Sequence, residues 1–354
     1  MEKILILQDK RGYTAGSLLP EAHRKIDGEF LKKELEKQDM VVEIKNLHEL
    51  VFPTQYKGWY IVYPSSEDAG LFYKEYIEDI LLRLTLEGAI LLPRFELFRA
   101  HHNKVFMELY RTILSEEYNS IQSVVFYGAD DLEKKLSSSK QFPIVMKTSE
   151  GAGSCGVSIA HNKKEAVKKA KKMGNIIFYG NYYSRMQKLR HILGRLHMKL
   201  KGEYYIDTPK IQEKMVYQTL IPNLSCDYKV LVFGKKYYLL RRKVRKNDFR
   251  ASGSGKLEFP EEFTDIEREV LTFAKKAYEQ LHTPLLSIDI AHDGKKCHMI
   301  EFQCLNFGPY TLQFSECYYV QDNYGGWSRL QGNSILEEEM AKAYSEYVKG
   351  NSVK

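Results

Sequence analysis

Residues 141–157 read Q-F-P-I-V-M-K-T-S-E-G-A-G-S-C-G-V, and this stretch decides how we interpret the rest of the chain. It joins a short apolar run, typical of a buried strand, to a lysine and then to a glycine-rich turn. Gly151, Gly153 and Gly156 allow positive φ angles, so backbone N–H groups can approach anionic oxygens beside the charge of Lys147. Because the lysine precedes the glycines, the stretch fits neither a P-loop nor a Rossmann turn. On this stretch alone, a polyphosphate-binding loop and an ordinary hairpin turn beside a surface lysine both remain open.

The composition limits the class of protein. The chain has 354 residues, of which 44% are hydrophobic and 28% charged, which predicts a globular protein with two or three compact units. No apolar run approaches the roughly 18 residues of a membrane helix, and the first residues alternate like a strand, so we expect a cytoplasmic protein. The five cysteines form no C-x-x-C pair, which favours free thiols over structural zinc. The net charge of +7 favours an anionic ligand, but we expect no specific nucleic-acid binding.

The first hundred residues alternate between strand and helix patterns. Such alternation predicts an α/β domain with an open, largely parallel sheet. Loops at the carboxyl ends of its strands could hold a small substrate. Residues 64–70 form one such loop, and a solvated turn that caps a helix is the alternative interpretation. A further helix is expected over residues 95–114, with Lys104 near its start.

Residues 179–205 form a basic stretch in which arginine, lysine and histidine alternate with tyrosine, leucine and isoleucine. Such a segment could bind nucleic acid, a membrane surface or an anionic polymer. The alternative, an exposed insertion helix whose charges are solvated, is the one that we favour.

The last third of the sequence predicts two hairpins with a helix between them. Residues 226–242 form the first hairpin, a capping box at Thr264 begins the helix, and residues 285–303 form the second hairpin. The second hairpin carries Asp289, Glu301 and Gln303 within otherwise apolar strands. Carboxylates are seldom buried unpaired, so we expect a metal ion or an arginine partner.

The register of the second hairpin determines whether the two carboxylates can share one metal ion. Side chains alternate with period two along a strand. A two-residue turn would place Glu301 on the face opposite Asp289, whereas a three-residue loop over residues 294–296 would pair Asp289 with Glu301 and Asp293 with Cys297. We therefore predict an odd-length loop or a bulge, with Glu301 and Gln303 on the Asp289 face.

Seven features in order give the chain a family resemblance. They are Lys104, Lys147 with its glycine loop, Q-E-K-M at 212–215, D-Y-K-V-L-V-F at 227–233, R-R with D-F-R at 241–250, Asp289, and E-F-Q at 301–303. This order resembles the ATP-grasp superfamily, especially the branch of glutathione synthetase and the ribosomal-protein glutamate ligases. The resemblance covers about residues 100 to 315.

The resemblance implies a domain organisation. An N-terminal α/β substrate domain at 1–100 would precede a two-subdomain ATP-grasp fold. Residues 101–141 and 213–354 would form its central subdomain. Residues 142–212 would form its lid, with the basic insertion at 179–205.

The resemblance also implies an activity and its cofactors. The activity is that of an ATP-dependent carboxylate–amine ligase, which forms an amide through an acyl phosphate and releases ADP and phosphate. ATP and two Mg²⁺ ions would be the cofactors. The partners would be an amine and a carboxylate, either a small molecule or borne on a polymer.

Each matching residue takes a role from the family. Lys104 and Lys147 would hold the ATP phosphates, and Asp227 would contact the ribose or the nucleotide. The lid loop over the phosphates would include Ser149, Gly151, Gly153, Ser154 and Gly156. The adenine pocket would be lined by the backbone of Gln212, Glu213, Lys214 and Met215. The phosphoryl group and the substrate carboxylate would be neutralised by Arg241 and Arg250, and Mg²⁺ would be held by Asp289, Glu301 and Gln303.

The chain departs from the family pattern at two positions, and two other functions stay open. Gln303 stands where the family has asparagine, and Cys155 places a thiol in the phosphate loop. In one alternative the acceptor is a polymer, such as a cell-surface glycan or a peptide, gripped by residues 179–205. In the other, the protein is a nucleotide-binding regulator that has lost turnover.

Overall fold

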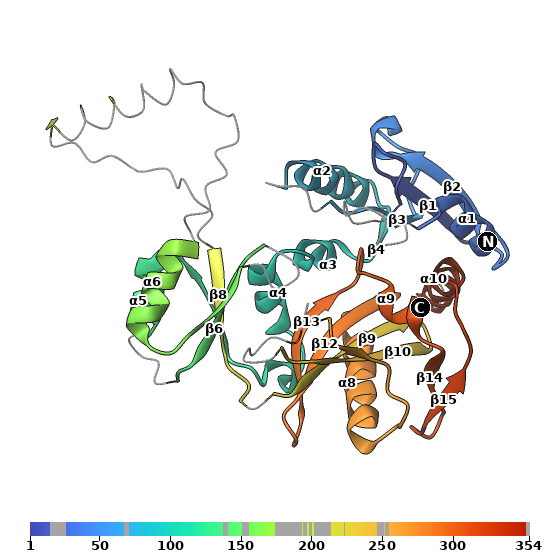
Figure 1. Ribbon diagram of the computed structural model, residues 1–354. Helices are drawn as coiled ribbons and strands as arrows, with labels where there is room; N and C mark the ends of the chain where they lie inside the picture. Colours follow the sequence, from blue (N-terminus) through green and yellow to red (C-terminus); the bar gives the residue numbers. More distant parts are fainter. Residues whose placement is uncertain are drawn as a thin grey trace. The chain divides into compact units, whose positions relative to one another are not determined.

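The computed structural model describes residues 1–14, 26–66, 71–136, 141–150, 156–173, 193, 197, 200–201, 214–222, 224–245, 251 and 255–351. These residues divide into two compact units (Figure 1). The first unit comprises residues 1–122, 150–155 and 221–354, and the second comprises 123–149 and 156–220. No helix in the described part of the chain combines the length and apolarity of a membrane span.

The first unit begins with a four-stranded parallel sheet of order β2-β1-β3-β4, as the alternating pattern predicted. Its strands are β1 (Lys3–Gln8), β2 (Val41–Asn46), β3 (Tyr60–Val62) and β4 (Ile90–Leu92), and its helices are α1 (Gly28–Glu36) and α2 (Phe72–Leu86), with the short helix η1 (Leu47–Glu49) after β2. Residues Ile4 to Leu7 of β1 are fully buried, because both faces of the sheet are covered. The predicted α/β fold class is therefore confirmed for this part.

The helix expected over residues 95–114 is instead two helices. They are α3 (Phe95–Ala100) and α4 (Lys104–Arg111), followed by the short helix η2 (Glu116–Asn119). His102 between them has a φ of 59°, a left-handed conformation that interrupts a helix. The side chain of Asn103 then caps α4 by accepting a hydrogen bond from the backbone N–H of Phe106. Lys104 is thus the first residue of a helix, next to its positive dipole end.

The first unit also contains an antiparallel sheet of seven strands, in the order β13-β12-β9-β10-β14-β15, with β11 paired to β10. The strands are β9 (Cys226–Phe233), β10 (Lys236–Lys243), β11 (Leu257–Glu258), β12 (Leu285–His292), β13 (Cys297–Gln303), β14 (Cys317–Gln321) and β15 (Trp327–Gln331). The helices are α8 (Asp265–Leu281), α9 (Tyr310–Phe314) and α10 (Leu336–Asn351). Helix α8 begins at the predicted capping box of Thr264 and Glu267.

The two faces of this sheet have different neighbours. Val230, Ile288 and Phe302 lie on one face and share a core with apolar residues of α8. On the other face, the end that includes Phe233 and Leu285 packs against α10 and β1. The remainder of that second face carries charged residues.

The second unit is a four-stranded antiparallel sheet of order β5-β8-β6-β7 with two helices. Its elements are β5 (Ser123–Tyr127), α5 (Gly128–Lys135), β6 (Ile144–Thr148), β7 (Val157–Ala160), α6 (Lys163–Met173) and β8 (Lys214–Thr219). The lid boundary expected at residue 142 lies inside this unit, because β5 already pairs with β8. Most of the basic stretch 179–205 lies outside the described residues, so its role stays a prediction.

Candidate active site

Six polar side chains lie on the second face of the seven-stranded sheet, and we call this group the polar face. Its members are Asp227 and Lys229 of β9, Arg242 of β10, Asp289 of β12, and Glu301 and Gln303 of β13. Asp227 pairs with Arg242, and Asp289 pairs with both Lys229 and Glu301. Because directly paired residues of an antiparallel sheet point to the same face, the six side chains share one surface.

The predicted pairing of Asp289 with Glu301 is confirmed in the hairpin of β12 and β13, and a β-bulge in β13 produces it. Asp289 pairs with Glu301, but the next residue, Ile290, pairs with Met299, so Ile300 has no partner in the register. The predicted three-residue loop is wrong, because His292 pairs with Cys297 and the loop has four residues, 293–296. Without the bulge, this loop would turn Glu301 to the α8 face.

The two aspartates of the polar face are bound to cations. Arg242 donates to Asp227 from Nε to Oδ1 at 2.7 Å and from Nη2 to Oδ2 at 2.9 Å. The same Nη2 lies 2.9 Å from Oδ2 of Asp289, and Lys229 Nζ lies 3.5 Å from Oδ1 of Asp289. The predicted arginine partner of the buried carboxylates is therefore Arg242.

The pKa values of the two aspartates are shifted in opposite directions, because burial outweighs the neighbouring cations at Asp227 but not at Asp289. Burial raises the pKa of Asp227 to about 6, although Arg242 stabilises its charged form. Burial also disfavours the charge of Asp289, but Arg242 and Lys229 outweigh it and lower the pKa of that carboxyl group. Asp289 thus remains an anion at neutral pH, as an oxygen ligand for a metal cation must.

Arg241, the sequence candidate for phosphoryl neutralisation, lies on the opposite face of the sheet. It pairs with Tyr228, and its Nη2 lies 3.0 Å from Oε2 of Glu258. Arg242 takes the place on the polar face instead. Strand parity could have revealed this, since a two-residue turn at 234–235 sets Arg242 opposite Asp227.

The two candidate phosphate lysines are both buried and belong to different units. Lys104 is 6% exposed in the first unit, and Lys147 is 7% exposed in the second. Ile144 and Met146 point into the helix-covered core of the second unit, so alternation places Lys147 on the opposite face of its sheet. Lys147 pairs with Val216, two residues from Lys214, which puts Lys214 on that same face.

Of the expected lid loop, the structure describes the two ends. Ser149 is buried, and its N–H donates to the carbonyl of Lys214 at 3.3 Å. Gly156 has a φ of +72°, and a Cβ at this position would lie 2.1 Å from Oγ1 of Thr148, so only glycine fits.

Met215, a candidate for the adenine pocket, packs its side chain into the core, which leaves only its backbone for an adenine contact. Gly151, Gly153, Ser154, Gln212, Glu213 and Arg250 lie outside the described residues, as does Cys155.

The polar face offers an oxygen donor set that fits Mg²⁺. Asp289 and Glu301 would contribute carboxylates, and Gln303 would contribute an amide oxygen from the same face. Within the described ranges, no group of three or more His, Cys, Asp or Glu side chains could hold a metal. Mg²⁺ usually takes only a few protein ligands and completes its coordination shell with substrate phosphates and water. Two carboxylates and one amide are consistent with this preference.

Comparison with solved structures supports the fold. The chain is similar to D-cycloserine synthetase DcsG, with a TM-score of 0.52 and 10% identity over 97% of this chain and 99% of that chain. It is also similar to D-alanine–D-alanine ligase from Bacillus anthracis complexed with ATP (TM-score 0.51, 12% identity, 100% of this chain and 99% of that chain). A third similar structure is D-alanyl-alanine synthetase A from Vibrio cholerae O1 biovar eltor (TM-score 0.50, 12% identity, 98% of both chains). Comparison of the sequence with protein-family models and with curated proteins finds no match. These similarities extend over nearly the whole chain and show that it has the ATP-grasp fold.

Proposed function

We propose that this protein is an ATP-dependent carboxylate–amine ligase that forms an amide through an acyl phosphate and releases ADP and phosphate. The observation that carries the proposal is the polar face, where the carboxylate pair of Asp289 and Glu301 lies beside the cations Arg242 and Lys229 on an ATP-grasp fold. The three similar structures are named as synthetases or ligases, and one was solved with ATP.

The charges of the polar face suit phosphoryl transfer. This reaction needs little from the protein except positioning and neutralisation of the negative charge that spreads over the transferred group. Arg242 and Lys229 would neutralise the phosphoryl group and the substrate carboxylate, which gives Arg242 the role first expected of Arg241. Asp227 would fix the orientation of the Arg242 guanidinium by its two hydrogen bonds.

The remaining residues would bind ATP and the metal. Asp289, Glu301 and Gln303 would hold Mg²⁺, which when bound neutralises phosphate oxygens. Lys104 and Lys147 would contact the ATP phosphates as fixed positive charges. The glutathione synthetase branch, the second Mg²⁺ ion and a polymer acceptor stay predictions.

A substrate screen tests this function. Purified protein with MgATP is incubated with pairs of carboxylates and amines, and ADP and phosphate are measured. We expect both products only with the correct carboxylate, and hydroxylamine should trap that carboxylate as a hydroxamate. Release of AMP and pyrophosphate would contradict the proposal, because it would indicate an acyl adenylate. Tight ATP binding without turnover across the whole screen would favour the regulatory alternative.

A further inference from the structure

Strand β13 lies at the edge of its sheet, and a buried part of this edge is covered by α4. Half of the backbone groups of an edge strand point away from the sheet, and buried ones need other partners. Met299, which is 1% exposed, is the last paired residue before the bulge. Its carbonyl oxygen accepts a hydrogen bond from Nη1 of Arg111 at 2.9 Å. The side chain of Arg111 therefore binds the backbone directly beside the bulge.

Arg111 is an unusual residue for this position, because it is a buried charge. It forms an ion pair with Glu108 one helical turn earlier, and the two side chains are 3% and 1% exposed. Nη2 of Arg111 also donates to the carbonyl of Ile121 at 3.2 Å. A planar guanidinium can hold three such acceptors in fixed directions, which a lysine ammonium on a flexible stem cannot. A buried ion pair is often no more stabilising than apolar residues of similar size. Stability alone therefore does not explain why a charged pair occupies this position, and the directions of its hydrogen bonds matter more.

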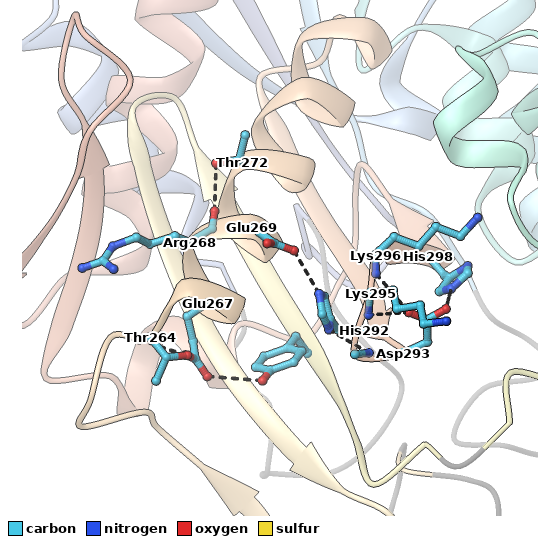
Figure 2. A network of polar contacts seen from close by, with 12 residues as sticks. Thr264, Glu267, Arg268, Glu269, Thr272, His292, Asp293, Lys295, Lys296 and His298 are labelled. Carbon is cyan, nitrogen blue, oxygen red and sulfur yellow. Dashed lines mark hydrogen bonds and ion pairs between the residues drawn. The ribbon is translucent and has the colours of Figure 1, made fainter.

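A second contact holds β13 at His298, the residue before Met299. Ring atom Nδ1 of His298 lies 2.9 Å from Oγ of Ser120. On the other side of the ring, Nε2 lies 2.8 Å from Oδ2 of Asp293 in the loop of the hairpin, and Figure 2 shows this second contact. His298 precedes Met299, and Ser120 precedes Ile121. Two consecutive residues of β13 are thus bound to α4 and to residues 120–121. We call Glu108, Arg111, Ser120 and His298 the bulge clamp.

The bulge clamp affects the polar face because side chains alternate between the two faces of a strand. A bulge adds one residue to one strand, and its loss would turn every following side chain to the other face. Without it, Glu301 and Gln303 would point toward α8, away from Asp289. The bond from Arg111 fixes the carbonyl of Met299, and Met299 is the residue directly before the unpaired Ile300.

We infer that Arg111 is a positioning residue, which holds the bulge of β13 and so keeps Glu301 beside Asp289. The expected effect of Arg111 on catalysis rests on the proposed function. Its effect on the bulge does not depend on that function. The same helix begins at Lys104 and ends at Arg111, so α4 connects a candidate phosphate ligand to the register of a candidate metal ligand.

The test replaces the buried pair with apolar side chains of similar size, in the variant Glu108→Leu/Arg111→Met. We expect it to fold, since such replacements are usually tolerated, but the carbonyl of Met299 loses its donor. In the protein without ligands, hydrogen exchange of residues 297–303 should become about tenfold faster or more. Binding of Mn²⁺ in the presence of ADP, followed by electron paramagnetic resonance, should weaken by about ten- to a hundredfold. With an active substrate pair, kcat should fall by a similar factor while the KM for ATP stays within about twofold.

Two further variants complete the test. Arg111→Lys keeps a cation beside Glu108 but cannot bond all three acceptors, so residues 297–303 should exchange at an intermediate rate. Arg268→Met removes another arginine with an acidic partner three residues earlier, on the exposed side of α8, and should leave the exchange unchanged. Wild-type exchange at 297–303 in both Arg111 variants overturns the inference, as does loss of turnover with unchanged exchange. Because exchange is measured without ligands, it supports or overturns the clamp even if the ligase assay fails.

Discussion

Arg242 and Asp289 lie in contact on neighbouring parts of the polar face, with Nη2 of the arginine 2.9 Å from Oδ2 of the aspartate. Asp289 also faces Glu301 across the hairpin. The carboxylate expected to bind Mg²⁺ is therefore already held by the cation expected to neutralise the phosphoryl group. Such an arrangement keeps both groups charged and oriented before a nucleotide binds.

The first prediction separates the two neighbouring arginines. Arg242→Lys keeps the positive charge but loses the bidentate contact with Asp227, so kcat should fall by about ten- to a hundredfold. Arg241→Lys is the matched control on the opposite face, and its kcat should change by less than about threefold. Steady-state kinetics with thermal unfolding curves will check this. The opposite ranking of the two variants would return the catalytic role to Arg241.

The second prediction concerns Glu301. Replacing it with alanine should lower kcat by about a thousandfold, roughly 4 kcal/mol, because a metal ligand is lost from the polar face. The fold should persist, since Glu301 is only partly buried and the backbone pairing does not need its side chain. Glu261→Ala, at an exposed position, serves as the control. Activity close to wild type in Glu301→Ala, at saturating Mg²⁺, would disprove the metal site.

The third prediction concerns Lys147. Its removal in Lys147→Ala should cost roughly 1.5 to 3 kcal/mol of ATP binding, about ten- to a hundredfold in affinity, if it bonds phosphate oxygens. Isothermal titration calorimetry measures this directly. Lys168→Ala, on the exposed side of α6 in the same unit, should bind ATP like the wild type. Equal affinities for the two variants would remove Lys147 from the nucleotide site.

The fourth prediction uses the pKa of Asp227. This pKa is raised to about 6 in the folded state, above an unfolded value of about 3.9, so folding favours the protonated acid. The group therefore contributes stability below about pH 4 that is lost as the pH rises through about 6, an effect of about 1–3 kcal/mol. In urea unfolding, the free energy of unfolding of the wild type relative to Asp227→Asn should fall between pH 4.5 and 7.5. A constant difference between the wild type and Asp227→Asn over this range would refute the raised pKa.

Much of this protein follows from local patterns in its sequence. The alternation of strands and helices predicts the parallel N-terminal sheet, and the capping box at Thr264 predicts the start of α8. The period of two in strands is enough to require a bulge or an odd loop, if Asp289 and Glu301 are to share a face. These features depend on residues close together in the chain, whose backbone preferences and periodicity are visible without the fold.

Tertiary contacts decided the rest. The choice between a longer loop and a bulge, and the place of Arg242 beside Asp289, depend on pairings between distant segments. The bond from Arg111 to Met299 joins residues that are 188 positions apart. No local pattern marks such a contact, because its energy exists only after the two segments are buried against each other, where an unpaired carbonyl would be costly. The sequence by itself therefore determined which chemistry the polar face could carry, and the packing of α4 against the edge of β13 decided how its carboxylates are aligned.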